Sequence, residues 1–183
     1  MKKLLCLSVA VGVFSASAAF AQEVLTRRHY TLERTKQTNA LVAKVDVDAV
    51  GTNHLAAYEL QHSTEYKTGE KERIFYNKDS NRKIRVRTML FPTMVEAEKG
   101  VLSQLNDVSV IFTSGSPLGG TVGDNSWYYT EQGTGSTTVT FIRNNVVISV
   151  FAQHAATVAD KLARELDADI LAGKNGVELK TQK

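Results

Sequence analysis

The apolar run over residues 146–151, Val-Val-Ile-Ser-Val-Phe, constrains the fold more than any other feature of the sequence. A strand with one solvated face alternates between apolar and polar residues, whereas a nearly unbroken apolar run is typical of a strand covered on both faces. Residues 137–143 precede this run, and Asn144 and Asn145, which tolerate positive φ, separate the two segments. The sequence therefore predicts a hairpin over residues 137–152, with a central strand of a sheet as its second arm.

Further strands are predicted from alternation and from β-branched residues. The segment from Leu41 to Ala49 alternates most regularly, with Ala43, Val45 and Val47 on one side. A loop at 77–81 joins two of the other expected strands as a hairpin. These other strands are expected at residues 54–62, around 74–76, at 84–88, at 108–112 and at 127–130.

Apolar residues at three- and four-residue steps predict a first helix from Met94 to Leu105. Thr93 has the pattern of its N-cap, with Glu96 three residues later, and Pro92 ends the strand before it. The helix is expected despite Gly100 in its interior, which costs about 1 kcal/mol relative to alanine.

A second helix is predicted near the end of the chain by the apolar stripe Val158, Leu162, Leu166 and Ile170. We expect it to begin with Thr157 and Asp160 as a capping pair and to end at Gly173. It is the element most suited to cover the central apolar strand.

This order of elements is typical of an α+β domain with a largely antiparallel sheet. Two main helices are expected to pack on it, on one face. We expect the single α+β domain to span residues 41–173. Residues 22–40 are interpreted as a polar lead-in or an edge strand, and residues 174–183 as a polar tail.

The first 21 residues have the three parts of a secretory signal peptide. The basic start Met1-Lys2-Lys3 is followed by a short apolar run, and Ala19-Phe20-Ala21 forms an A-x-A cleavage site. The apolar run is shorter than the roughly 20 residues that span a membrane, so cleavage after Ala21 is expected in place of a retained anchor. We therefore expect a periplasmic or secreted protein that is not inserted in a membrane after cleavage.

Composition narrows the classes of function. The 22 basic residues include Lys2 and Lys3, so cleavage would leave 20 basic against 19 acidic side chains in the remaining 162 of 183 residues. This near-neutral balance gives no argument for nucleic acid as a partner. Cys6 is the single cysteine, and its position inside the apolar run argues against a lipoprotein. The mature chain would thus have no disulfide and no cysteine nucleophile.

Residues 115–124, Gly-Ser-Pro-Leu-Gly-Gly-Thr-Val-Gly-Asp, form a glycine-rich loop. A backbone without Cβ atoms lets a ligand approach closely, so Gly119 and Gly120 are candidate ligand-binding residues. The alternative is a connector that lets the chain reverse over the edge of the sheet.

Asp124 and Trp127 follow directly at the end of this loop. Asp124 could orient a ligand hydroxyl, while Trp127 and Tyr129 could stack on a sugar or on a partner side chain. The alternative is an Asx-type turn followed by a core tryptophan, with Tyr128 or Tyr129 partly exposed.

Arg85 and Arg87 share a strand face with Lys83, because side chains alternate across a strand. If Arg73 lay across the hairpin, these residues would form a basic stripe that fits carboxylate, phosphate or sulfate groups. The alternative is a solvated sheet face whose charge is balanced by nearby glutamates.

Motifs for catalysis, metals and cofactors are missing from the sequence. The four histidines form no H-x-x-x-H or H-x-H pattern, no G-x-S-x-G elbow is present, and the glycine-rich loop is not followed by Lys-Ser or Lys-Thr as in a P-loop. We therefore assign no catalytic residue, metal ligand or cofactor. A catalytic site assembled from distant residues stays open.

The stretch from Gly123-Asp124-x-x-Trp127 through Phe141-Ile142-Arg143-Asn144-Asn145-x-Val147 to the last helix resembles small secreted bacterial α+β domains of unassigned function. The likeness covers roughly the C-terminal half of the chain. It implies an α+β fold in an extracytoplasmic setting, and it carries no activity and no site residues.

We therefore expect an exported, non-catalytic binding or accessory protein that engages a protein or glycan through the glycine-rich loop and the adjacent aromatic residues. Two alternatives stay open. One is a hydrolase directed at envelope material, with a site assembled only in the fold. The other is an extracytoplasmic inhibitor or immunity-type protein, which an identified partner would distinguish.

Overall fold

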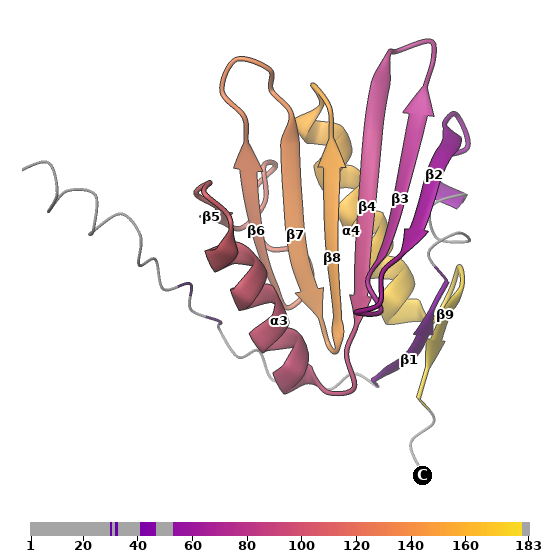
Figure 1. Ribbon diagram of the computed structural model, residues 1–183, viewed down its shortest axis with the longest axis vertical. Coiled ribbons are helices and arrows are strands. Elements are labelled where there is room, and N and C mark those ends of the chain that lie inside the picture. Colours follow the sequence, from indigo (N-terminus) through magenta and orange to yellow (C-terminus); the bar gives the residue numbers. More distant parts are fainter. Residues whose placement is uncertain (1–29, 31, 33–40, 47–52, 181–183) are drawn as a thin grey trace, which may run out of the picture. The chain divides into compact units, whose positions relative to one another are not determined.

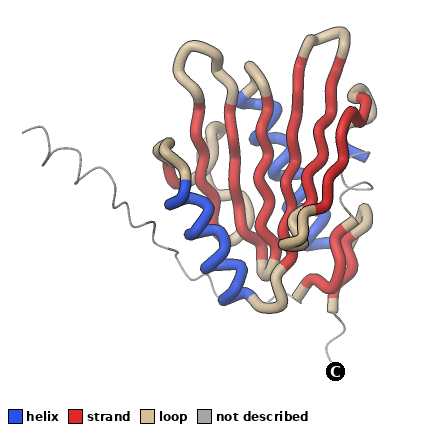
Figure 2. The backbone as a smooth tube through the Cα atoms, viewed as in Figure 1, coloured by secondary structure: helices blue, strands red, loops and turns tan. Residues whose placement is uncertain are grey.

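A seven-stranded antiparallel sheet and two helices dominate the part of the chain that the computed structural model describes, which is residues 30, 32, 41–46 and 53–180 (Figures 1 and 2). The α+β class is thereby confirmed. In sheet order the strands are β2 (Glu59–Glu65), β3 (Lys71–Asn77), β4 (Arg82–Leu90), β8 (Val146–Ala152), β7 (Thr137–Arg143), β6 (Asn125–Thr130) and β5 (Thr113–Ser114).

The predicted central hairpin is confirmed. Arg143 pairs with Val146 across a two-residue turn, and Asn144 takes the positive φ of 51° that an asparagine tolerates. On its other side β8 pairs with β4 along the whole strand, so β8 is the middle strand of the sheet. All of its side chains are buried except Ser149 and Phe151, which are half-buried. The apolar run therefore has the double coverage that the sequence predicts.

The two helices cover opposite faces of the sheet, and the expectation of a single helical face is wrong. Figure 1 shows α3 (Met94–Asp107) in front of the sheet and α4 (Ala156–Ala172) behind it. The main core lies on the α4 side, where Val150 of β8 packs with Leu162 and Leu166. The apolar run explains the difference, because Val147 and its neighbours provide a second buried face that the order of elements does not reveal.

The sequence predicts the start of α3 and both ends of α4, and two of these three helix ends are confirmed. The Thr93 hydroxyl accepts a hydrogen bond from the Glu96 N–H at 3.2 Å, which makes Thr93 the N-cap of α3, and it donates one to the Glu96 carboxylate at 2.9 Å. Gly173 ends α4 in the left-handed conformation, with φ of 60°. The start of α4 differs, because Ala155 is the N-cap without a side-chain bond, and Asp160 is buried within the helix.

Two of the predicted strands differ from the structure in position or extent. Strand β2 begins at Glu59, and His54 lies in a helical turn before it, not in a strand over residues 54–62. Residues 108–112 form no strand, and β5 is limited to Thr113–Ser114. Val110 and Phe112 in this segment are half-buried beside the sheet. Their alternation therefore reflects contact with a neighbouring surface and not a hydrogen-bonded ladder.

A second, two-stranded sheet joins distant parts of the chain. Its strands are β1 (Val42–Val45), within the alternating segment that the sequence predicts, and β9 (Val177–Leu179). Strand β9 lies within residues 174–183, for which the sequence predicts a polar tail, and Val177 is buried there. The expected signal peptide lies outside the described residues, as does most of the 22–40 lead-in. Within the described part, no helix has the length and apolar character to cross a membrane.

Candidate functional site

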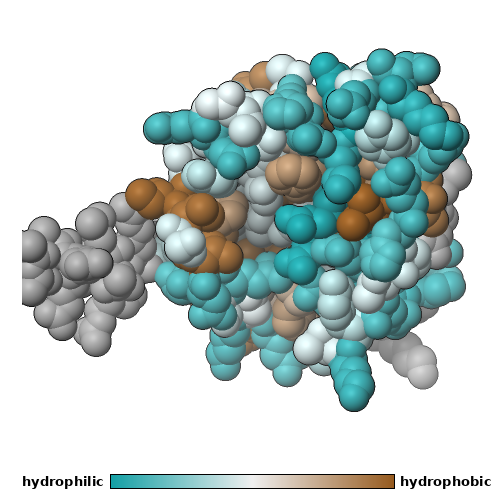
Figure 3. All heavy atoms as spheres, turned by 45° about the horizontal axis from the view of Figure 1, so that its top comes forward, coloured by the Kyte–Doolittle hydropathy of each residue, from teal (hydrophilic) through white to brown (hydrophobic). Residues whose placement is uncertain are grey.

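A groove lies on the front face of the sheet, at the place where α3 stops covering it. Its volume is about 540 Å³, within the roughly 300–1,000 Å³ of typical small-molecule sites. Figure 3 shows a hollow on this side, with hydrophilic side chains in teal and hydrophobic ones in brown around it. We call it the α3 groove, and its lining residues are Glu70, Arg85, Arg87, Gln104, Leu105, Asp107, Val108, Val110, Phe112, Tyr129, Thr138, Thr140, Ser149 and Phe151.

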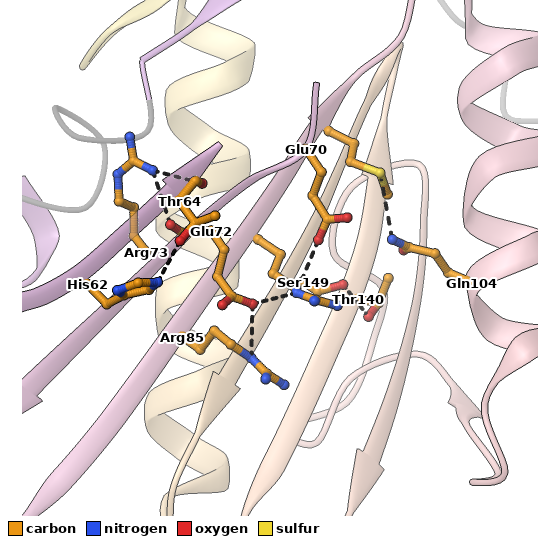
Figure 4. Close-up of polar contacts among 11 residues, drawn as sticks. His62, Thr64, Glu70, Glu72, Arg73, Arg85, Gln104, Thr140 and Ser149 are labelled. Carbon is orange, nitrogen blue, oxygen red and sulfur yellow. Dashed lines mark hydrogen bonds and ion pairs between the residues drawn. The ribbon is translucent and has the colours of Figure 1, made fainter. Parts of the chain in front are cut away.

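Strand register explains why the floor of the α3 groove is polar. Thr140 of β7 and Ser149 of β8 are register partners, so their side chains point to the same face, and their hydroxyls lie 2.8 Å apart (Figure 4). Thr138 pairs with Phe151 in the same way, one step along the hairpin. Ser149 is the one polar residue in the central apolar run. It thus lies where α3 leaves the front face of the sheet uncovered.

Arg87 is held in the groove by two glutamates. It pairs in register with Glu72 of β3, and its Nε donates to the Glu72 carboxylate at 2.7 Å and lies 3.1 Å from Glu70. Burial alone would lower the pKa of Arg87, but the hydrogen bond to Glu72 and the charges of Glu70 and Glu72 together raise it. Arg87 is therefore a permanently charged donor with a fixed position.

Arg85 lies beside this pair and is less tightly held. Its Nε is 3.9 Å from the Glu72 carboxylate, and its guanidinium carbon is 5.4 Å from the centre of the Phe151 ring. That placement is a cation–π contact. The side chain is 41% exposed, so it is available to a ligand.

The predicted basic stripe is not formed, because Arg73 faces the other way. Arg73 pairs with Val86, whose side chain packs in the main core, whereas Arg85 and Arg87 pair with Ile74 and Glu72. Arg73 is buried on that opposite face and donates to the carbonyls of Thr64 and Glu72.

Three aromatic side chains line the groove. Phe112 and Tyr129 contact each other with ring centres 6.3 Å apart and planes tilted by 56°, and Phe151 lies under Arg85. All three are half-buried, so each has part of a ring facing the groove. Tilted pairs of this kind keep aromatic faces in fixed positions.

Of the candidate ligand-binding residues, Arg85, Arg87 and Tyr129 come together in the α3 groove. Trp127 shares that face of the sheet, since it pairs with Thr140, but only 2% of it is exposed. Gly119, Gly120 and Asp124 do not line the groove.

The glycine-rich loop is fastened to α4. Arg164 donates to the Ser116 hydroxyl at 2.8 Å and to the Gly119 carbonyl at 2.6 Å, and its Nε is bonded to the buried Asp160 at 2.8 Å. Gly123 donates its N–H to Asp167 at 3.1 Å. These bonds are those of a connector, the alternative that the sequence left open.

Asp124 ends this loop by binding the turn of the central hairpin. One carboxylate oxygen accepts from Arg143 and the other from the Asn144 N–H, both at 2.7 Å. Arg143 also binds Asp167 of α4 through two bonds of 2.6 and 2.9 Å. The hydrogen bond to Asp167 is the largest influence on the pKa of Arg143, and with the charges of Asp167 and Asp124 it outweighs burial and raises that pKa.

Replacing Gly123 with alanine is expected to lower the free energy of unfolding by about 2–3 kcal/mol, because a left-handed residue with a Cβ is strained and the new atom clashes. Gly123 has φ of 69°, and an added Cβ would lie 2.3 Å from the Ile142 carbonyl oxygen. Gly119→Ala is the matched control, since its φ is 87° but the space around it is open. Urea unfolding of both variants measures the difference, and equal losses would show that the close approach is unimportant.

In the part of the chain that the structure describes, no group of three or more His, Cys, Asp or Glu side chains is arranged to hold a metal ion. His54 instead bonds Asp169 at 2.5 Å and lies 3.5 Å from Glu165, which ties its helical turn to α4.

Comparison with known proteins gives no relative: no family, no curated protein and no solved structure matches this chain. The candidate site therefore depends on its geometry alone. Sequence reasoning missed Phe112, Phe151 and the hydroxyls of the floor. A signal for the floor was present, because Ser149 interrupts an apolar run and Thr140 lies across from it.

Proposed function

We propose that this chain is an exported, non-catalytic binding protein that holds its ligand in the α3 groove. The observation that carries the proposal is the convergence, in one groove of ligand size, of fixed polar groups and half-exposed aromatic rings. Arg87 is clamped by Glu70 and Glu72, so its orientation costs little entropy when a ligand binds. This proposal locates the ligand on the face of the sheet, whereas the sequence favoured the glycine-rich loop and the adjacent aromatic residues.

The surroundings of Ser149, the serine in the groove, favour a binding function over hydrolysis. A nucleophilic serine needs a general base within hydrogen-bond reach, whereas the Ser149 hydroxyl shares a hydrogen bond with Thr140. Two hydroxyls paired in this way supply donors and acceptors for a ligand. They do not activate each other as nucleophiles.

Filling the groove is expected to abolish ligand binding without unfolding the protein. Thr138→Trp places a large ring among Tyr129 and Phe151, the register neighbours of Thr138, on a strand that favours aromatic residues. The control is Gln61→Trp on the exposed strand β2, outside the groove. Amide NMR spectra are recorded with a library of mono- and disaccharides, amino acids and dipeptides.

At least one of these compounds should shift the amides of β4, β7 and β8 in the parent protein and in Gln61→Trp, and the shifts should disappear in Thr138→Trp. Thermal unfolding confirms that each variant is folded. The proposal fails if no compound shifts these amides, or if the shifts persist in folded Thr138→Trp.

Export is expected to remove residues 1–21. When the full sequence is expressed in a Gram-negative host, the periplasmic product should begin at Gln22, as measured by N-terminal sequencing. Ala21→Arg places a large charged residue at the cleavage site, and we expect the uncleaved precursor to accumulate. Recovery of the parent chain from the cytosol with Met1 attached would contradict an exported function.

A further inference from the structure

Both arginines of the α3 groove already lie beside carboxylates, so an anionic ligand would find neither guanidinium group without a counter-charge. Arg87 is bound to Glu70 and Glu72, and Arg85 shares the Glu72 carboxylate. Asp107 adds a further carboxylate at the end of α3. An anionic ligand would therefore compete with the glutamates, most strongly at Arg87, and would be repelled by Asp107, whereas a cationic ligand would face two arginines.

The polar groups match a ligand that is neutral but rich in hydroxyls. A hydroxyl donates one hydrogen bond and accepts others, so it can bind an arginine N–H and a carboxylate or threonine oxygen without disturbing their ion pairs. Charge-assisted bonds of this kind are stronger than those between neutral groups. The donors are Arg85 and Arg87, and the acceptors include Asp107 and Thr138.

The aromatic rings in the groove suit the apolar face of a sugar ring. A sugar ring has hydroxyls around its edge and a face of C–H groups that is apolar, so it can lie flat on an aromatic side chain while its edge meets polar groups. Tyr129 and Phe112 form a tilted corner of this kind, and the polar residues of β4 lie across the groove from them. The volume of about 540 Å³ exceeds the needs of a metal ion or a single small anion.

We infer that the α3 groove binds a neutral saccharide, with a sugar ring on Tyr129 and Phe112 and its hydroxyls on Arg85 and Arg87. This inference depends on the proposed function, because it names the ligand of the same groove. It replaces the anion-binding interpretation that a basic stripe would have supported.

The test is titration of the protein with three sets of probes, followed by amide NMR and calorimetry. The neutral set is maltose, cellobiose and chitobiose, the acidic set is digalacturonic acid and a sulfated heparin disaccharide, and the peptide set is dialanine and diserine. At least one neutral sugar should bind in the groove at least tenfold more tightly than either acidic sugar. Its affinity should be unchanged between low and high salt, because no net charge is neutralised.

Single substitutions test which side chains contact the sugar. Tyr129→Leu should weaken binding of the neutral sugar at least tenfold, and Tyr129→Phe, which keeps the ring, should restore most of it. Arg85→Gln should also weaken binding, whereas Lys83→Gln, on the same strand but outside the groove lining, should not.

Two outcomes overturn the inference. Acidic sugars or dipeptides that bind in the groove as tightly as the neutral sugars would show a different ligand class, and would leave the proposed binding function intact. The absence of groove shifts with every saccharide would also overturn it. In that case the wider library and the Thr138→Trp variant decide the proposed function separately.

Discussion

Asn145→Ala is expected to lower the free energy of unfolding by about 4 kcal/mol, because several buried backbone groups lose their partners and each costs about 1–3 kcal/mol when left unpaired. Asn145 is fully buried in the turn of the central hairpin. Its amide group donates to the carbonyls of Val42 and Phe91 at 3.0 and 2.7 Å, and its side-chain oxygen accepts from the Val42 N–H at 2.8 Å. One side chain thus joins β1, the end of β4 and the β7–β8 turn.

The matched control for this prediction is Asn81→Ala. Asn81 also lies in a hairpin turn with φ of 51°, but it is exposed and accepts one bond, from the Tyr76 hydroxyl. Its loss should therefore be about 1 kcal/mol, mainly from the positive φ. Urea unfolding compares the two variants, and hydrogen exchange should show that the Val42 amide loses protection in Asn145→Ala alone. Similar losses in both variants would refute the clamping role.

Arg143→Met is expected to cost about 3–4 kcal/mol, because removal of one partner of a buried ion pair leaves the other charge without compensation. Arg143 has a side chain that is only 14% exposed, and it holds Asp124 and Asp167 together through three bonds of 2.6–2.9 Å. Without it, two carboxylates would repel each other where the glycine-rich loop meets α4. The raised pKa of Arg143 means that its guanidinium group stays charged throughout the denaturation experiments.

Two further variants separate geometry from charge in this cluster. Arg143→Lys keeps the charge but cannot form the forked bonds to Asp167, so we expect an intermediate loss. Lys161→Met removes an exposed ion pair with Glu165, 3.9 Å long, and should change stability by less than about 0.5 kcal/mol. Chemical denaturation measures all three. A loss for Arg143→Met no larger than that for Lys161→Met would contradict the structural role of the cluster.

The fold was predictable where local pattern and tertiary structure agree. The apolar run around Ile148 has to be a covered strand whatever surrounds it, and the Thr93 N-cap starts α3 through bonds to Glu96, three residues later. Gly173 likewise ends α4 by its own conformation. Predictions failed where a residue's environment is non-local. The apolar residues of segment 108–112 alternate as in a strand, but Val110 and Phe112 line a groove.

The candidate site was only partly predictable. Arg85, Arg87 and Tyr129 were candidates from residue type, and the fold brings them together although more than 40 residues separate Tyr129 from Arg87. Asp124 was also a candidate, but its bonds to Arg143 and Asn144 give it a place in the framework. Residue chemistry alone does not distinguish an aspartate that binds a ligand from one that binds an arginine of the same chain.

The sequence by itself determined the class of fold, the central hairpin and the cysteine-free chemistry of the expected mature chain, because these follow from periodicity, turn residues and composition. Only the tertiary structure decided which face each helix covers, which arginines are neutralised and where the groove opens. Those properties depend on strand register, since a shift of one residue turns a side chain to the opposite face. In the sequence, Arg73 and Arg87 are both candidates for the basic stripe. The β3–β4 register places Arg73 on the core side of the sheet and Arg87 in the groove.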